Sequence, residues 1–218
     1  MKVLIELPTW LGDAVMTTPA IENLENHFSD AEITLVGSTI AIEAIKGHPK
    51  VFKTYILDKT FKSTFQLLTD LGQFDAFFSF RGSLRSKLIK FCVSSKSKFQ
   101  FDKKKYIKDH QVEKYNNFIN DSLNINTFPG NLKLHTKEKK TDGKNKLLGI
   151  NPGASYGSAK RWYPKEFAKV AIDLSSQYDI MIFGGPGEKN IANEIEKYLI
   201  KKGVNNYQNL AVKTSIKE

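Results

Sequence analysis

Short apolar runs alternate with segments of helical spacing along most of the 218 residues. The predicted strands are β-branched and aromatic runs at 3–7, 31–37, 51–57, 74–80, 147–150 and 179–183. The predicted helices lie at 14–27, 39–46, 64–71, 83–91, 110–123, 164–178 and 188–202, whereas the polar residues 98–106 are predicted to be irregular. Because strands that alternate with helices form right-handed βαβ units, the chain is predicted to have an α/β fold with open parallel sheets.

A change in composition divides the chain. Apolar residues become sparse between 124 and 146, where Pro129-Gly130 and Asp142-Gly143 mark turns. We therefore expect one α/β domain at 1–123, an interdomain segment at 124–146 and a second domain at 147–218. The second series is about half as long as a doubly wound domain of roughly 100–150 residues, so this domain is predicted to be incomplete.

The chain carries a formal net charge of +10. Such an excess suits nucleic acid, an anionic membrane surface or an acidic substrate, and it is equally compatible with a solvated lysine-rich exterior. No recognised nucleic-acid motif accompanies it, so no nucleic-acid partner is expected. No apolar run approaches the ~18 residues of a spanning helix, and the N-terminus lacks the pattern of a signal peptide, so we expect a cytoplasmic location.

Cysteine and histidine usage gives no sign of a metal centre. The single cysteine, Cys92, excludes an internal disulfide and a cysteine-based zinc cluster. The four histidines, at 27, 48, 110 and 135, are scattered and suggest no metal-ligand spacing. We therefore expect no metal site.

Residues 7–20 join the first predicted strand to the first predicted helix. In open parallel sheets, ligands bind at this edge, outside the carboxyl ends of the strands. Gly12 permits a tight turn, and Asp13 then lies near the start of the helix, where its carboxylate can face the ligand. The alternative is that Asp13 is an N-cap that pairs free backbone donors. The segment lacks the G-x-G-x-x-G pattern of a nicotinamide or flavin site.

Two glycine-containing loops follow strands in the second series. Residues 151–164 combine small residues, a proline-initiated helix and the charge of Lys160, which together suit a pyrophosphate. The loop at 183–188 can bring its backbone close to a nucleoside, with Glu188 reaching a ribose or base. The first segment is equally compatible with an ordinary strand-to-helix loop, and turns like the second often serve only that geometry.

Together these segments resemble glycosyltransferase family 9, the ADP-heptose:lipopolysaccharide heptosyltransferases, and most closely the heptosyltransferase II group. The resemblance is colinear along the whole chain. It is carried by Trp10-Leu11-Gly12-Asp13-Ala14-Val15-Met16, Asn151-Pro152-Gly153-Ala154, Ala159-Lys160-Arg161-Trp162, Phe183-Gly184-Gly185-Pro186-Gly187-Glu188 and Asn209-Leu210-Ala211.

The resemblance implies a GT-B architecture, in which two Rossmann-like, doubly wound domains face a cleft. The N-terminal domain would hold the acceptor and the C-terminal domain the ADP-heptose. Asp13 would be the general base that deprotonates an acceptor hydroxyl as it attacks the anomeric carbon with inversion. Lys160, with the amides and hydroxyl near Ser155, would stabilise the leaving ADP without a metal or other cofactor. Glu188 would contact the nucleoside.

The resemblance also implies a binding role for three basic residues. Arg81, Arg85 and Lys87 follow the fourth predicted strand and would meet the acidic Kdo and phosphate groups of a Kdo- and heptose-containing lipid A acceptor. The alternative for this trio is a solvated helix face. Both the acceptor and the inner face of the cytoplasmic membrane are anionic, so a peripheral position on that membrane is expected as well.

Two departures from the family pattern leave two hypotheses. Val212 stands where the family usually has glycine, and the family's later Asp-Ser-Gly segment followed by histidine has no counterpart in this sequence. The chain is predicted either to transfer heptose from ADP-heptose to the inner core of lipopolysaccharide or lipooligosaccharide, or to be a truncated, non-catalytic remnant of such an enzyme.

Overall fold

The computed structural model describes residues 1–58, 60–136, 145–154 and 158–214. The chain divides into two compact units, Met1–Lys137 and Glu138–Glu218. No helix in the described ranges is long and apolar enough to cross a bilayer.

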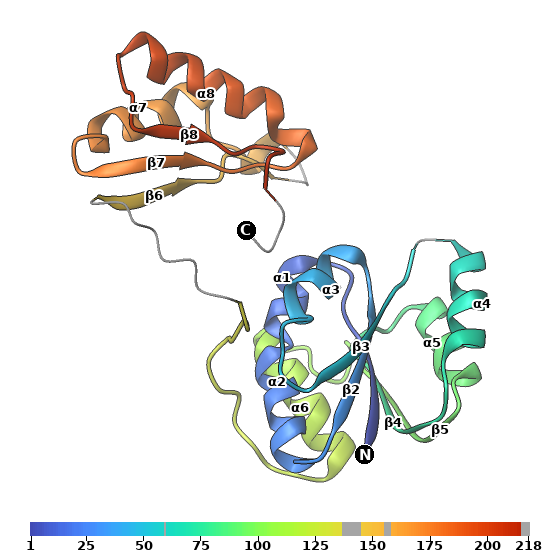
Figure 1. Cartoon of the computed structure of the whole chain (residues 1–218). Helices are drawn as coiled ribbons and strands as arrows, with labels where there is room; N and C mark the ends of the chain where they lie inside the picture. Colours follow the sequence, from blue (N-terminus) through green and yellow to red (C-terminus); the bar gives the residue numbers. More distant parts are fainter. Residues whose placement is uncertain (59, 137–144, 155–157, 215–218) are drawn as a thin grey trace. The chain divides into compact units, whose positions relative to one another are not determined.

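The first unit is built on a parallel sheet with the strand order β3-β2-β1-β4-β5 (Figure 1). Its strands are β1 Lys2–Glu6, β2 Glu32–Gly37, β3 Val51–Ile56, β4 Phe74–Ser79 and β5 Ser95–Gln100. The direction in which strands are added reverses between β1 and β4. In open α/β sheets, the crevice at the carboxyl ends of two such strands is where ligands bind.

Helices cover both faces of this sheet. They are α1 Leu11–Met16, α2 Thr18–His27, α3 Thr39–Ile45, α4 Phe61–Asp70, α5 Leu84–Cys92 and α6 Gln111–Leu123. Alternate residues of β1 enter different cores, because strand side chains point to opposite faces in turn. Val3 and Ile5 pack with α2, α3 and α6, while Leu4 packs with Leu67 of α4 and Ile89 of α5.

The strand β5 was not expected from the sequence. Residues 98–106 were predicted to be irregular, but Lys98 to Gln100 pair with β4 in parallel register. The strand reads Ser-Lys-Ser-Lys-Phe-Gln and lies at an edge of the sheet. Edge strands keep one side in water and tolerate lysine and serine, so the usual apolar signal is weak here.

The single helix predicted at 14–27 is two helices that meet at Thr17. The hydroxyls of Thr17 and Thr18 donate to the carbonyls of Ala14 (2.6 Å) and Val15 (2.9 Å). Pro19 in the first turn of α2 has no N–H to continue the ladder of α1. The break leaves α1 as a short helix that directly follows the end of β1.

Residues beyond α6 are hydrogen-bonded to the first unit. Asn116 and Asn120 donate their side-chain amides to the carbonyl of Thr127, at 2.6 and 2.8 Å. Asn23 of α2 donates to the carbonyl of Phe128 at 3.0 Å. The first part of the segment expected to join the domains is therefore held against α2 and α6.

A cluster that we call the Glu22 clasp holds the end of this segment. Glu22 accepts hydrogen bonds from His48 (3.1 Å), His135 (3.1 Å) and Lys133 (3.2 Å). A Cβ at Gly47 would overlap the carbonyl oxygen of His135, so the close approach requires glycine there. The clasp thus joins 133–135 to α2 and to the turn after α3.

The Glu22 clasp brings together two histidines that are far apart in the sequence. The ligand atoms of Glu22, His48 and His135 lie within 4.8 Å of one another. The backbone N–H of Lys50 donates to Nδ1 of His48 at 3.3 Å, which leaves the proton of the neutral ring on Nε2. In this tautomer Nε2 donates to Glu22, and the three side chains form a hydrogen-bonded cluster.

The second unit is a smaller parallel sheet in the order β6-β7-β8. Its strands are β6 Lys146–Ile150, β7 Tyr178–Ile182 and β8 Tyr207–Asn209, and its helices are α7 Pro164–Leu174 and α8 Lys189–Lys201. Short 3₁₀ turns at Ser158–Lys160 and Pro186–Glu188 precede the helices. Ile150, Ile180 and Ile182 pack against alanines and Ile195 of α7 and α8. The three-residue β8 was not predicted, since it is too short to give a periodic signal.

Val212, the residue that departs from the family pattern, has a backbone conformation that suits glycine. Its φ is +66°, in the left-handed region, which is strained for a β-branched side chain. Its N–H donates to the carbonyl of Gly184 at 2.8 Å, and this bond ties the turn after β8 to the loop after β7. The structure therefore explains why a glycine would be favoured at this position.

Replacing Val212 by glycine is expected to stabilise the second unit by about 1 kcal/mol. The relief of roughly 1–3 kcal/mol of backbone strain exceeds the ~0.4–1 kcal/mol entropic cost of a glycine in the unfolded chain. Hydrogen exchange of peptides from α8 and β8 would measure the change. The matched control is Asn124→Gly, at φ +53°, which should change stability less because asparagine tolerates this region. A less stable Val212→Gly would contradict the assignment of strain.

Candidate active site

Asp13 lies in the first turn of α1, just beyond the carboxyl end of β1. The N-cap of α1 is Trp10, so the alternative that Asp13 caps this helix is excluded. Asp13 is half-buried. Burial raises the pKa of Tyr115 in α6, and the charge of Asp13 raises it further. Asp13 thus follows the carboxyl end of β1, and its charge acts on α6.

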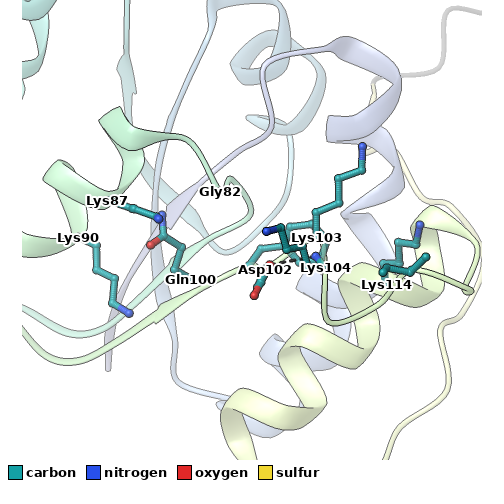
Figure 2. A pocket seen from close by; sticks show the side chains of 10 residues that line it. Gly82, Lys87, Lys90, Gln100, Asp102, Lys103, Lys104 and Lys114 are labelled. Atoms are coloured by element: carbon teal, nitrogen blue, oxygen red, sulfur yellow. Dashed lines mark hydrogen bonds between the residues drawn. The ribbon is translucent and has the colours of Figure 1, made fainter.

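A basic pocket of about 740 Å³ lies between α5, the end of β5 and α6 (Figure 2). We call it the lysine pocket. Its charged lining consists of one carboxylate, Asp102, and five lysines, namely Lys87, Lys90, Lys103, Lys104 and Lys114. Lys114 directly precedes Tyr115 in α6, the residue on which the charge of Asp13 acts. Such a surplus of ammonium groups favours an anionic ligand.

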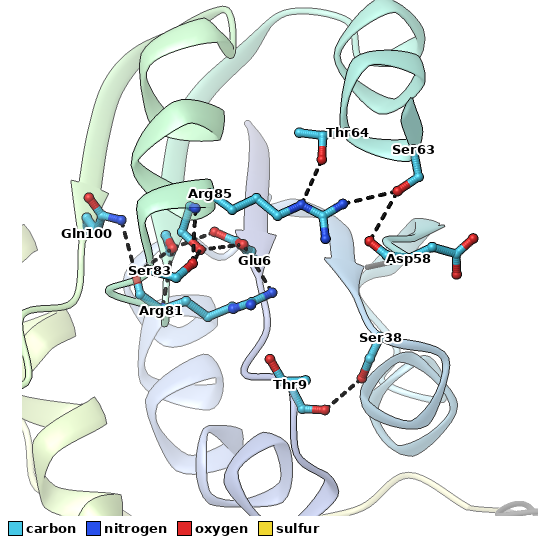
Figure 3. A network of polar contacts seen from close by, with 12 residues as sticks. Glu6, Thr9, Ser38, Asp58, Ser63, Thr64, Arg81, Ser83, Arg85 and Gln100 are labelled. Atoms are coloured by element: carbon cyan, nitrogen blue, oxygen red, sulfur yellow. Dashed lines mark hydrogen bonds and ion pairs between the residues drawn. The ribbon is translucent and has the colours of Figure 1, made fainter. Parts of the chain in front are cut away.

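The three residues predicted to bind the acceptor point to different partners. Lys87 lines the lysine pocket. Arg81, in the loop after β4, lies 3.6 Å from the carboxylate of Glu6. Arg85 instead donates to the Thr64 hydroxyl at 2.7 Å and to the Ser63 hydroxyl at 3.0 Å, at the start of α4 (Figure 3). The structure thus places Lys87, but not Arg85, in the basic pocket.

Glu6 is a polar residue of this edge that sequence reasoning did not select. It is fully buried in β1, where its carboxylate accepts hydrogen bonds from Ser79 (2.6 Å) and Ser86 (2.8 Å). Burial raises its pKa, against the opposing effects of the Ser79 hydrogen bond and the charge of Arg81. The sequence feature that could have identified Glu6 is an acidic residue within the apolar run predicted as the first strand. Glu6 ties β1 to β4 and α5 at the switch point and orients Arg81 above it.

Glu188 lies between the two glycine-containing loops of the second unit. Its Oε2 accepts a hydrogen bond from the backbone N–H of Gly185 at 2.9 Å. A Cβ at Gly153 would overlap the Glu188 side chain, so this glycine lets the loop after β6 pack on the loop after β7. The carboxylate lies at the carboxyl edge of the small sheet, and its contact with a nucleoside stays a prediction.

The basic residues of the first loop are exposed at the same edge. Lys160 ends the 3₁₀ turn and is exposed. Arg161 donates to the carbonyl of Ala154 at 2.8 and 3.2 Å. Ser155, predicted to act near the pyrophosphate, lies outside the described residues.

Curated proteins of known activity resemble this chain along its whole length. Lipooligosaccharide heptosyltransferase 2 of Campylobacter jejuni is 43% identical over 226 residues, which cover 100% of this chain and 70% of that protein. The enzyme of the same name from Haemophilus ducreyi is 25% identical, with coverage of 100% and 73%.

Solved structures share the fold. E. coli ADP-heptose LPS heptosyltransferase II superimposes with a TM-score of 0.80 at 20% identity, covering 100% of this chain and 74% of that one. E. coli heptosyltransferase WaaC with ADP gives a TM-score of 0.74 at 15% identity, covering 95% and 74%. The predicted fold class, an α/β fold with the two Rossmann-like units of GT-B glycosyltransferases, is confirmed.

The sequence profile described as glycosyltransferase family 9 (heptosyltransferase) matches residues 66–218. This range includes the lysine pocket and both loops of the second unit. Given this match and a 43% identical relative aligned with the entire chain, the protein belongs to glycosyltransferase family 9, the heptosyltransferases.

Proposed function

We propose that this protein transfers heptose, with inversion, from ADP-heptose to a Kdo- and heptose-containing acceptor of the lipooligosaccharide inner core. The observation that carries the proposal is the position of Asp13. Its half-buried carboxylate lies beyond the carboxyl end of β1, and its charge acts on Tyr115, the neighbour in α6 of Lys114, which is one of the five lysines that line the pocket. A base beside a cationic pocket suits an acceptor that carries both a reacting hydroxyl and acidic groups.

In this mechanism the first unit binds and activates the acceptor. Acidic groups of the sugar enter the lysine pocket, which orients a hydroxyl toward Asp13. Asp13 takes the proton of that hydroxyl as its oxygen attacks the anomeric carbon from the face opposite the leaving group. The new glycosidic bond forms as the bond to ADP breaks, so the configuration inverts.

The second unit is proposed to hold the donor through the edge formed by the loops after β6 and β7. Lys160 is assigned to the pyrophosphate, where its charge offsets the negative charge that develops on the departing ADP. Ser155 is assigned to the same group, and Glu188 to the nucleoside. We assign this stabilisation to the protein's own cation rather than to a metal or other cofactor.

Replacing Lys103 and Lys104 by alanine together is expected to raise the KM for the acceptor roughly tenfold, which corresponds to about 1.4 kcal/mol of lost binding. The Kd for ADP should stay unchanged, because the lysine pocket belongs to the first unit. Steady-state kinetics with a Kdo-containing acceptor, and calorimetry with ADP, would measure the two quantities.

Lys96→Ala is the matched control, since Lys96 pairs with Asp75 on the exposed surface and is not among the residues that line the pocket. It should leave both constants unchanged. The donor assignment predicts that ADP binds more tightly than UDP or NAD. A chain that shows no saturable ADP binding would contradict the donor assignment and favour the non-catalytic alternative.

A further inference from the structure

The helix α5 carries an apolar stripe that faces solvent. Leu84, Leu88 and Phe91 are spaced i, i+4, i+7 and therefore share one side of the helix. Leu84 and Phe91 are each 83% exposed, and Leu88 is 39% exposed. The opposite side, with Ser86 and Ile89, is buried on the sheet. The helix thus has two apolar sides, and only one of them packs against the part of the chain that the structure describes.

Positive charge borders this stripe. The helix contains Arg85, Lys87 and Lys90 and no acidic residue. Lys87 and Lys90 follow one flank of the stripe and also line the lysine pocket, so the stripe and the pocket are adjacent surfaces of the same helix. Ile107, which is 72% exposed, is a further apolar residue among those that line the pocket.

The apolar stripe and its flanking cations together favour one class of partner over another. Nucleic acid would use the lysines but would leave large aliphatic and aromatic side chains without a role. An apolar stripe flanked by cations alone is the pattern of helices that lie in the interface of an anionic bilayer. There the side chains enter the acyl boundary while the ammonium groups meet phosphates.

We propose that α5 docks the first unit on an anionic lipid bilayer, with Leu84, Leu88 and Phe91 inserted at the interface and the lysine pocket open to the headgroup layer beside them. The purpose of this docking rests on the proposed function, because an acceptor built on lipid A must be met at a membrane. The docking itself depends only on the stripe and its charges. It would bring the pocket to the depth at which the acidic sugars of such an acceptor begin.

The test is co-sedimentation of the full chain with vesicles. Phosphatidylglycerol–phosphatidylethanolamine vesicles supply an anionic surface, and phosphatidylcholine vesicles a neutral one. The chain is expected to sediment with the first and not with the second. The double variant Leu84→Ser/Phe91→Ser should bind the anionic vesicles at least about tenfold more weakly, since it loses two apolar side chains that would be buried. Circular dichroism would verify that this variant is folded.

The matched control is Phe52→Ser/Ile200→Ser, which removes two exposed apolar side chains, 75% and 60% exposed, that lie on β3 and α8. It should bind like the parent chain. A third variant, Lys87→Glu/Lys90→Glu, should also lose binding, by about fivefold or more for each lysine.

Three results would overturn the proposal: no binding to anionic vesicles, equal binding to neutral ones, or full binding by the Leu84/Phe91 variant. Loss in the lysine variant alone would indicate a pocket for acidic ligands without insertion, and it too would overturn docking through the stripe. Heptose transfer to a soluble, deacylated acceptor separates the two hypotheses. Transfer that persists without vesicle binding contradicts only the docking, and vesicle binding without transfer contradicts only the proposed function.

Discussion

Asp13→Asn is expected to lower kcat by about 10²–10⁴-fold, the usual contribution of a positioned general base. The amide keeps the size of the carboxylate and its place in the first turn of α1, but it cannot take a proton from the acceptor hydroxyl. The Kd for ADP should stay unchanged, because the nucleotide is assigned to the second unit. Single-turnover kinetics and calorimetry on the same preparation would measure both.

Asp102→Asn is the control for this substitution. Asp102 is the carboxylate of the lysine pocket, and its Oδ1 accepts a hydrogen bond from the backbone N–H of Lys104 at 2.9 Å, which an asparagine oxygen can also accept. This variant should keep its kcat and lower the KM for an acidic acceptor, since it removes a like charge from the pocket. If Asp13→Asn and Asp102→Asn had the same kcat, the base would have to be another residue.

Glu6→Ala should destabilise the first unit by about 1–3 kcal/mol, the cost of removing a hydrogen-bond partner from buried polar groups. The substitution removes the carboxylate that accepts from the hydroxyls of Ser79 and Ser86 and that pairs with Arg81, so these hydroxyls keep only their contacts with the Arg81 carbonyl and the Ser83 hydroxyl. Because a whole domain is stable by only ~5–15 kcal/mol, a large part of the margin would be lost. Denaturant-dependent hydrogen exchange of peptides from β1 and β4 would report on the first unit alone.

Glu6→Gln separates the charge from the hydrogen bonds. Glutamine keeps an acceptor oxygen at nearly the same place and is less costly to bury than a carboxylate, so its loss of stability should be smaller. A Glu6→Ala variant that lost no more than about 1 kcal/mol, as an exposed ion pair does, would mean that the buried network contributes little.

The sequence was sufficient to predict the strands and helices that carry strong periodicity. β1, β2 and β4 are nearly continuous apolar runs because both faces of each strand are covered, and such runs are typical of parallel sheets. β5 could not be predicted in this way, since its lysines and serines sit at an edge where water replaces a neighbouring strand. The break at Thr17 depends on two side-chain hydrogen bonds that no periodicity records.

The candidate site was predictable only where a local motif marks it. Asp13 and Glu188 could be selected because each follows a strand at the ligand-binding edge. The lysine pocket could not, because Lys87 and Lys114 come from helices separated by β5 and meet only in the fold. Arg85 belonged to a plausible basic trio, yet its hydrogen bonds to Thr64 and Ser63 depend on the packing of α4 against α5.

The Glu22 clasp determines how short a fragment of the first unit can usefully be made. The sheet and its helices are complete at Leu123, so that residue is the natural place to cut the gene. A fragment ending there would lack the Thr127 carbonyl, which accepts hydrogen bonds from Asn116 and Asn120; these two side chains are 0% and 9% exposed. It would also lack two of the three donors to Glu22. Buried amides without partners are costly, so we expect a fragment to fold well only if it extends to residue 136.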